Sequence, residues 1–206
     1  MSKFINLDEL AVEIIDGDRG ENYPPKSEFK DDGYCLFLNT SNITPSGFDF
    51  STKDFISKKR DGLLRKGKLS KNDIVLTTRG TVGNVAYYNE DVPFEHIRIN
   101  SGMVILRPDK NYIDPYYLFT FLNSDLFKKQ VKNQGSGSAQ PQLPIQALNK
   151  IKVPDIDLNY QKKISNFVKP IDKNIFINEE QNSNMIELIQ LIFNYWFVQF
   201  DYPSEN

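Results

Sequence analysis

The most reactive side chains in this sequence are a single histidine, His96, and a single cysteine, Cys35. Glu95 and Asp91 lie close to His96 in the chain, and a carboxylate beside an imidazole can serve general acid–base catalysis. Cys35 falls within an apolar run, where cysteine usually behaves as a small buried hydrophobe. We expect both residues to be structural. An enzyme that uses His96 with Glu95 or Asp91 is the open alternative.

Motifs that support common catalytic chemistry are missing from the sequence. It contains no Gly-x-Ser-x-Gly elbow, no Walker-type phosphate loop and no metal-ligand spacing. Residues 80–83, Gly-Thr-Val-Gly, lack a lysine that could reach a phosphate and are expected to form a turn. Residues 22–25 have the letters of the amino-methyltransferase motif Asn-Pro-Pro-Tyr in the wrong order, and no Gly-rich loop suits S-adenosylmethionine. We therefore expect no catalytic residue, metal or cofactor in this chain.

The composition favours a folded protein outside the membrane. The chain has 206 residues, of which 39% are hydrophobic and 13% aromatic, which is enough for a core. No run approaches the roughly 18 apolar residues that a membrane helix needs, and the N-terminus has no secretory leader. One cysteine cannot form an internal disulfide, so we expect a cytoplasmic protein in a reducing compartment.

The net charge of −2 conceals an uneven distribution along the chain. Residues 58–79 include eight basic residues and two acids, whereas the chain from Asp155 onward has eight acids and four lysines. A basic middle and an acidic tail could present one face to a polyanion and another to protein partners. Ordinary solvated faces are the open alternative.

Residues 1–155 alternate short apolar runs with turn signals. Four of these runs are predicted strands: 34–38, 73–77, 84–88 and 102–107. Asp114 is expected to cap a helix that has Pro115 in its first turn and continues through Phe127. Many short strands with few helices predict an α+β fold built on a curved, mostly antiparallel sheet.

From Ile164 onward, apolar and Asn residues recur at alternating steps of three and four, the pattern of a heptad seam. The seam consists of Ile164, Val168, Ile171, Ile175, Asn178, Asn182, Met185, Ile189, Ile192 and Trp196. Pro170 lacks a backbone donor. We therefore expect a short helix that ends near Val168 and a long one that starts near Pro170 and reaches about Phe200.

Such a helix is too long to bury its seam against a domain with a radius of gyration near 15 Å, so it needs a partner helix. Asn178 and Asn182 would set the register of a coiled coil. The residues expected to make the dimer contact are Ile171, Ile175, Asn178, Asn182, Met185, Ile189, Ile192 and Trp196. A helix folded back on its own domain is the open alternative.

Several segments, in their order, resemble the specificity (S) subunit of type I restriction–modification systems. They are 16–20 with Tyr23 and Pro24, 37–43, 72–83, 142–144, 151–154, 160–164 and 196–200. That family alternates target recognition domains with helical conserved regions, usually two of each, whereas this sequence has one of each. It therefore resembles a half subunit. The recognition domain is predicted over 1–155, and a helical region for dimerisation and methyltransferase docking is predicted over 156–206.

The resemblance implies a non-catalytic subunit whose recognition domain reads double-stranded DNA. A methyltransferase (M) subunit would carry S-adenosylmethionine, and a restriction/translocase (R) subunit would join for cleavage. Head-to-tail pairing with a second copy of the chain would give a palindromic, bipartite site. A coiled-coil adaptor that binds no DNA is the open alternative.

Within that resemblance, the polar loops are candidate base readers, because Asn and Gln suit adenine and Arg suits guanine. These candidates are Arg19, Tyr23, Lys26, Asn39, Thr40, Ser41, Asn42, Thr78, Arg79, Asn84, Ser136, Ser138, Gln140 and Gln142. The basic run is expected to contact phosphates, which set register and salt dependence rather than sequence. Its residues are Lys58, Lys59, Arg60, Arg65, Lys66 and Lys68.

Overall fold

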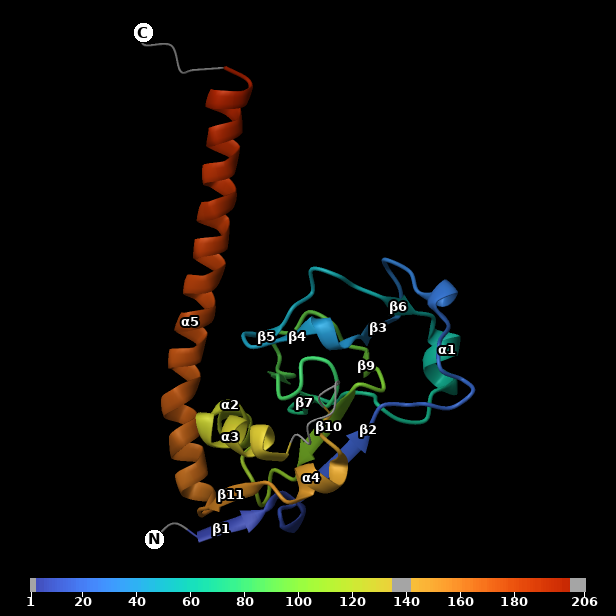
Figure 1. Ribbon diagram of the computed structural model, residues 1–206, viewed down its shortest axis with the longest axis vertical. Helices are drawn as coiled ribbons and strands as arrows, with labels where there is room; N and C mark the ends of the chain where they lie inside the picture. Colours follow the sequence, from blue (N-terminus) through green and yellow to red (C-terminus); the bar gives the residue numbers. More distant parts are fainter. Residues whose placement is uncertain (1–2, 135–141, 201–206) are drawn as a thin grey trace. The chain divides into compact units, whose positions relative to one another are not determined.

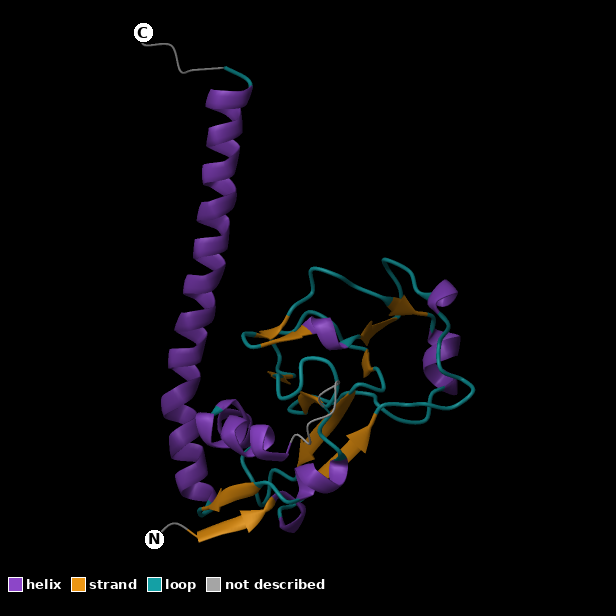
Figure 2. Cartoon of the chain, in the orientation of Figure 1, coloured by secondary structure: helices purple, strands orange, loops and turns teal. Residues whose placement is uncertain are grey.

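The computed structural model describes residues 3–134 and 142–200, which form a mixed α/β fold with a long C-terminal helix (Figure 1). The chain divides into two compact units, Met1–Ser165 and Asn166–Asn206. The first unit contains all the described strands, and the second contains most of the long helix (Figure 2). The expected α+β class with mostly antiparallel sheets is confirmed.

The largest sheet is antiparallel throughout and has the strand order β2-β10-β7-β8. Its strands are β2 (Val12–Asp16), β7 (Ile74–Thr77), β8 (Val85–Tyr87) and β10 (Met103–Pro108). Ile105 of β10 lies opposite Ile15 on one side and Val75 on the other. Three of the four runs predicted as strands lie in this sheet beside β2, because each is rich in the β-branched and aromatic residues that pack well on a pleated surface.

Three smaller sheets complete the first unit. Their strands are β1 (Lys3–Asn6) with β11 (Lys152–Asp155), β4 (Ile43–Thr44) with β5 (Gly47–Phe48), and β6 (Phe55–Ile56) with β3 (Cys35–Leu38) and β9 (Ile97–Ile99). The β3–β9 pair is parallel. The β1–β11 pair joins segments from opposite ends of the first unit, so the unit is closed by its own chain ends.

The central strand β10 contributes side chains to two cores, because successive residues of a strand point to opposite faces. Val104 and Leu106 pack with apolar residues of the helices that follow β10. Met103 and Ile105 pack with residues of β3 and β9. The main sheet is therefore a middle layer, covered by helices on one face and by a smaller sheet on the other.

The expected helix cap at Asp114 is confirmed. Its carboxylate accepts hydrogen bonds from the backbone N–H groups of Tyr116 (3.1 Å) and Tyr117 (2.9 Å) at the start of α2 (Pro115–Asn123). The same carboxylate accepts a hydrogen bond from the Ser165 hydroxyl, and the Gln161 side chain accepts one from the Asp114 N–H (2.7 Å). The start of the long C-terminal helix is thereby fixed to the first unit.

The single helix expected through Phe127 is wrong, since α2 is followed by a separate helix, α3 (Asp125–Gln134). Ser124 separates them in an extended conformation (φ −72°, ψ 155°). Its N–H donates to the Phe121 carbonyl, and its hydroxyl accepts from the Phe127 N–H (3.3 Å). Serine often competes with helix continuation in this way, ending one helix and capping the next.

The remaining helices of the first unit are short. They are α1 (Lys58–Leu63), α4 (Ile145–Asn149) and the 3-10 turns η1 (Leu7–Glu9), η2 (Lys26–Glu28) and η3 (Thr40–Asn42).

The C-terminal helix α5 is continuous over Leu158–Phe193, so the break expected at Pro170 is wrong. Proline removes one intrahelical hydrogen bond and crowds the preceding turn. The other bonds of this 36-residue helix offset that loss. The helix passes into a π-helical segment, η4 (Asn194–Val198). None of the described helices has the length and apolar character that crossing a membrane requires.

Candidate nucleic-acid interface

Loops of the first unit meet at the turn Asn100–Gly102, which precedes β10. A Cβ atom built on Gly102 would lie 2.7 Å from the Thr40 methyl carbon, 3.2 Å from Asn100 Oδ1 and 3.9 Å from Arg79 Cβ. Segments that are far apart in the sequence therefore touch at Gly102. Glycine supplies the close approach that a residue with a side chain would prevent.

Hydrogen bonds hold this junction together. The Gly102 carbonyl accepts from the backbone N–H groups of Thr78 (2.8 Å) and Arg79 (3.1 Å), and from the Thr78 hydroxyl (3.1 Å). The Thr78 carbonyl accepts from the Leu143 N–H (2.9 Å), which places Gln142 opposite Arg79.

Arg19 and Tyr23 contact the same turn through Ser101. The Arg19 guanidinium is 3.0 Å from the Asp16 carboxylate and donates to the Ser101 carbonyl (3.3 Å). The Tyr23 ring packs edge-on against Phe37, with 5.5 Å between centroids. Burial raises the pKa of Tyr23, although hydrogen bonds with Ser101 oppose the rise. The tyrosine is therefore neutral at physiological pH.

The residues that meet here are called the loop cluster below. The loop cluster consists of Arg19, Tyr23, 39–42, 78–84, 100–102 and Gln142. The structure thus brings together most of the described residues that the sequence singled out as base readers. Lys26 is exposed on η2 and has no contact with the loop cluster that the described residues record.

Three asparagine amides of the loop cluster are used by the fold itself. Asn42 is buried, and its Nδ2 donates to the carbonyls of Asp49 (2.9 Å) and Thr52 (2.8 Å). Asn84 Nδ2 donates to the Ile43 carbonyl (2.9 Å). The Asn39 side chain accepts from the Ser41 N–H (2.9 Å) as the cap of η3. These hydrogen bonds hold the loops in place and occupy the Nδ2 groups of Asn42 and Asn84 and the Oδ1 of Asn39.

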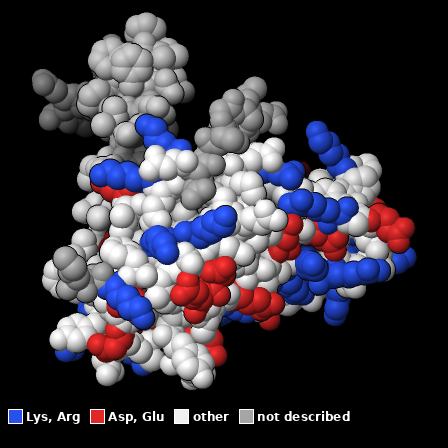
Figure 3. Space-filling view, turned by 60° about the horizontal axis from the view of Figure 1, so that its bottom comes forward, with Lys and Arg blue, Asp and Glu red and all other residues white. Residues whose placement is uncertain are grey.

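The basic run predicted to contact phosphates is partly neutralised by acids. Arg60 forms a two-pronged ion pair with Glu28, and Lys68 Nζ lies 2.6 Å from Asp61. Lys58 and Lys59 are exposed on α1. On the face of the molecule that Figure 3 shows, Lys and Arg side chains are interspersed among Asp and Glu.

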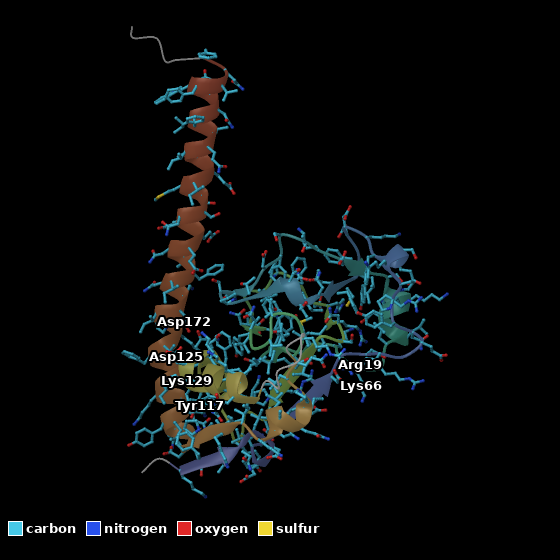
Figure 4. The ribbon with its side chains drawn as sticks, in the orientation of Figure 1. Arg19, Lys66, Tyr117, Asp125, Lys129 and Asp172 are labelled. Carbon is cyan, nitrogen blue, oxygen red and sulfur yellow. The ribbon has the colours of Figure 1, made fainter. Side chains whose placement is uncertain are left out.

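Arg65 and Lys66 are exposed and tied to the loop that carries Arg19. The Asp18 carboxylate accepts from the Arg65 N–H (2.8 Å). Backbone hydrogen bonds from Gly20 and Arg65 hold the pKa of Asp18 below its usual value, so this anchor is charged. Figure 4 shows Arg19 and Lys66 at the same edge of the first unit.

A buried ion pair lies next to the loop that contains Arg65 and Lys66 and is hydrogen-bonded to its backbone. Arg98 Nε lies 2.5 Å from the Asp61 carboxylate, and both side chains are 7% exposed. The Arg98 guanidinium also donates to the carbonyls of Lys66 (2.6 Å) and Leu64 (3.1 Å). Arg98 therefore sets the path of the chain that presents Arg65 and Lys66.

The sequence-based search missed two parts of this arrangement. The turn Asn100–Gly102 was not singled out, although Asn-Ser-Gly before an apolar run is a turn signal. The support from Arg98 was also missed, because a buried arginine has no signature in a single sequence. Ser136, Ser138 and Gln140 lie outside the described residues.

Neither reactive side chain has the surroundings of a catalytic acid–base pair: Cys35 lies beside the Asp61 carboxylate, and burial, together with the charge and hydrogen bond of that carboxylate, raises the pKa of the thiol. Cys35 is buried, and burial raises the pKa of its thiol to about 12, so it is protonated at physiological pH. The His96 ring stacks on Tyr34, with 4.3 Å between centroids. Among the described residues, no carboxylate forms a hydrogen bond or ion pair with the His96 ring.

Gly17 is expected to be essential to the junction. A Cβ at this position would lie 2.2 Å from the Asn100 carbonyl oxygen, a backbone atom that cannot move without displacing the turn. Gly17→Ala should therefore lower the free energy of unfolding by about 1–3 kcal/mol or more, measured by urea denaturation.

Gly62→Ala is the matched control for that experiment. Gly62 lies in α1 with open space around a built Cβ, so alanine should be neutral or stabilising by up to about 1 kcal/mol. Equal stabilities for Gly17→Ala and the parent chain would contradict the close approach.

The seam residues of α5 that lie in the second unit are largely exposed to solvent when the chain is taken by itself. Exposed fractions include 45% for Ile171, 51% for Ile175, 58% for Met185 and 65% for Ile189. Trp196, in η4, is 38% exposed. Isolated apolar residues on a surface need no explanation, but a continuous stripe usually marks an interaction site.

These observations define a mixed α/β fold with polar loops gathered around residues 100–102 and a long helix with exposed apolar residues. The family model described as the type I restriction modification DNA specificity domain matches residues 3–188. The chain belongs to this family.

The chain is also similar to curated specificity subunits. The chain is 24% identical over 188 residues to the type I restriction enzyme HindI specificity subunit of Haemophilus influenzae, covering 90% of this chain and 40% of the relative. It is 26% identical over 189 residues to the MjaVIII specificity subunit of Methanocaldococcus jannaschii, covering 88% and 43%.

The fold is similar to that of the type I restriction–modification S subunit from M. genitalium, with a TM-score of 0.64 at 18% identity, covering 99% of this chain and 46% of that one. The HsdS subunit from Thermoanaerobacter tengcongensis gives a TM-score of 0.58 at 16% identity, covering 95% and 44%. The chain thus spans less than half the length of each of these proteins.

Proposed function

We propose that this chain is a DNA-reading subunit of a type I restriction–modification complex. In this proposal the loop cluster contacts double-stranded DNA, and a methyltransferase subunit with S-adenosylmethionine modifies adenine. A restriction/translocase subunit joins for cleavage. The observation that carries the proposal is the gathering of four separate loops around Asn100–Gly102 in a chain of the DNA specificity domain family.

We further propose that two copies pair through α5, so that the complex has two recognition domains. The helix has 36 residues, which corresponds to a length of about 54 Å at 1.5 Å per residue. Its exposed apolar stripe needs a partner of similar length, and a second copy supplies one.

In the proposed dimer the two helices are antiparallel and centred between Asn178 and Asn182. In that register each of these two asparagines faces the other in the second copy. Every further seam residue then faces another seam residue: Ile175 opposite Met185, Ile171 opposite Ile189, Val168 opposite Ile192, and Ile164 opposite Trp196. All ten seam positions are paired, with the polar contacts at the centre, where they can fix the register.

An antiparallel pair with two-fold symmetry predicts a palindromic target. The two recognition domains would read inverted copies of one half-site, separated by a fixed gap. Methylome sequencing of cells that carry this chain and its methyltransferase should show such a motif. An asymmetric bipartite motif would show instead that a second, different recognition domain takes part.

DNA binding itself is tested by titrating fluorescent duplexes with the purified chain in complex with its methyltransferase. Binding should weaken steeply between 50 and 200 mM salt, by roughly a hundredfold or more if about six phosphates are contacted. Binding that does not depend on salt, or no binding, would favour a protein-interaction adaptor.

A further inference from the structure

The six arginines of the chain differ in whether their charge is already paired. Arg19, Arg60, Arg98 and Arg107 each form an ion pair with a carboxylate. Within the described part of the chain, Arg65 and Arg79 have no ion pair. Arg65 lines a hollow together with Asp18 and Glu21, whose charges oppose its own. Arg79 is exposed among uncharged residues of the loop cluster.

Hydrogen bonds fix the backbone around Arg79, whereas the Arg79 side chain is exposed. The N–H groups of Thr78 and Arg79 donate to the Gly102 carbonyl, and the Gly83 N–H donates to the Thr77 carbonyl (3.0 Å). The Thr77 hydroxyl donates to the Thr81 carbonyl and accepts from the Asn84 N–H. Gly80 and Gly83 have positive φ angles of 70° and 94°, which let the loop turn this tightly.

The tip of this loop offers hydrogen-bond donors that have no acceptor. Among the described residues, no group accepts from the backbone N–H of Thr81 or of Val82. Arg79 precedes these two residues by two and three positions in the same turn, and its side chain is exposed. Successive free amides beside a cation form a typical binding site for an anionic oxygen group.

A base edge is the less suitable ligand for this tip. Adenine is read through an amide that both donates and accepts. The amide nitrogens of Asn42 and Asn84 donate to backbone carbonyls of the fold, and the Asn39 amide oxygen accepts from the Ser41 N–H. The unpaired donors at the tip match a phosphate group: guanine N7 and O6 could accept from the Arg79 guanidinium alone, but a phosphate has enough acceptor oxygens for the guanidinium and both amides.

On the basis of the proposed function, we propose that Arg79 and the amides of Thr81 and Val82 bind one phosphate of the DNA backbone. This contact fixes the register of the recognition domain on its site. Arg79 thus acts as a positioning residue, and the bases are read by other groups.

The test compares Arg79→Ala with the parent chain in complex with its methyltransferase, on duplexes that carry the methylated motif or a scrambled one. Arg79→Ala should weaken both by the same factor, about three- to tenfold at 150 mM salt, and should reduce the slope of log affinity against log salt by about 0.9. The methylome motif should be unchanged.

Lys110→Ala is the matched control. It removes the same charge from an exposed residue that follows β10, at the opposite end of the strand from Gly102, and should leave both affinities unchanged.

A second measurement identifies the phosphate. Duplexes with one uncharged methylphosphonate at successive positions should reveal one position that weakens the parent chain and has no further effect on Arg79→Ala. Loss of affinity for the motif duplex alone, or a relaxed base in the methylome, would show that Arg79 reads a base and would overturn the proposal.

The remaining outcomes are also decisive. Unchanged binding by Arg79→Ala while the parent chain binds DNA would overturn the phosphate contact and leave the proposed function intact. Failure of the parent chain to bind any duplex would overturn the proposed function itself. Saturable binding of inorganic phosphate below about 1 mM, lost in Arg79→Ala, would assign the site to a free anion instead of DNA.

Discussion

Asp61→Ala is expected to lower the free energy of unfolding by about 3–5 kcal/mol, because it leaves the Arg98 guanidinium buried without a counter-charge. The two side chains are 2.5 Å apart and 7% exposed, so water cannot replace the lost carboxylate. Urea denaturation followed by circular dichroism would measure the change. A loss below 1 kcal/mol would contradict a dry ion pair.

Lys68→Ala is the appropriate comparison. Lys68 also lies against Asp61, at 2.6 Å, but its side chain is 39% exposed. Exposed partners contribute at most about 1 kcal/mol, so this variant should be far less destabilised than Asp61→Ala. The difference between the two variants separates the loss of a buried partner from the loss of a surface one.

The same site predicts a specific dependence on pH. Burial alone would raise the pKa of Asp61, but hydrogen bonds and charge from Lys68 and Arg98 outweigh it and hold the pKa below 3.8. Its contribution to stability is therefore fully present above the unfolded value and is lost as the pH falls through the lowered pKa. Asp61→Ala should lack this acid-dependent component.

Loss of the Asp61–Arg98 ion pair is also expected to affect DNA binding. Arg98 also holds the carbonyls of Leu64 and Lys66, so its position determines where Arg65 and Lys66 are presented. If Asp61→Ala stays folded at low temperature, it should bind all duplexes more weakly, since the sequence predicts that Arg65 and Lys66 contact phosphates.

Local features of the fold were predictable from the sequence. The runs 34–38, 73–77, 84–88 and 102–107 correspond to β3, β7, β8 and β10, and Asp114 caps α2. These features follow from neighbouring residues, where propensity and capping act directly. The pairing of β1 with β11 and the parallel pair of β3 with β9 were not predictable, because they depend on contacts between distant segments.

The candidate site was predictable in its residue types and not in their roles. Asn42, Asn84 and Arg79 were equally plausible as base readers, since all three lie in polar loops. The structure separates them by burial and by hydrogen bonds that cross the fold, such as the one from Asn84 to the Ile43 carbonyl. A single sequence does not contain that information.

The seam of α5 gives the second large prediction, which concerns the proposed antiparallel dimer. In the register centred between Asn178 and Asn182, Ile171 of one copy faces Ile189 of the other at two symmetric places. Ile171→Lys and Ile189→Glu, each purified alone, would set a charge against an apolar residue at both places. A cost of about 2 kcal/mol at each would raise the dimer dissociation constant on the order of a thousandfold.

Mixing the two variants should restore the dimer. One contact then pairs the introduced lysine with the introduced glutamate, and the other is the original isoleucine pair. In a parallel dimer, residue 171 would face residue 171 and the mixture would contain two mismatched contacts. Analytical ultracentrifugation of each variant and of the mixture therefore distinguishes the two orientations.

Phe176→Lys controls for the effect of a new charge. Phe176 is 60% exposed and lies one position after Ile175, off the seam, so its replacement should leave the dimer intact. A mixture that stays monomeric while Phe176→Lys dimerises would rule out the antiparallel register. Both orientations have two-fold symmetry and predict inverted half-sites, but a parallel dimer would carry its two recognition domains at the same end of the coiled coil and would predict a shorter gap between the half-sites.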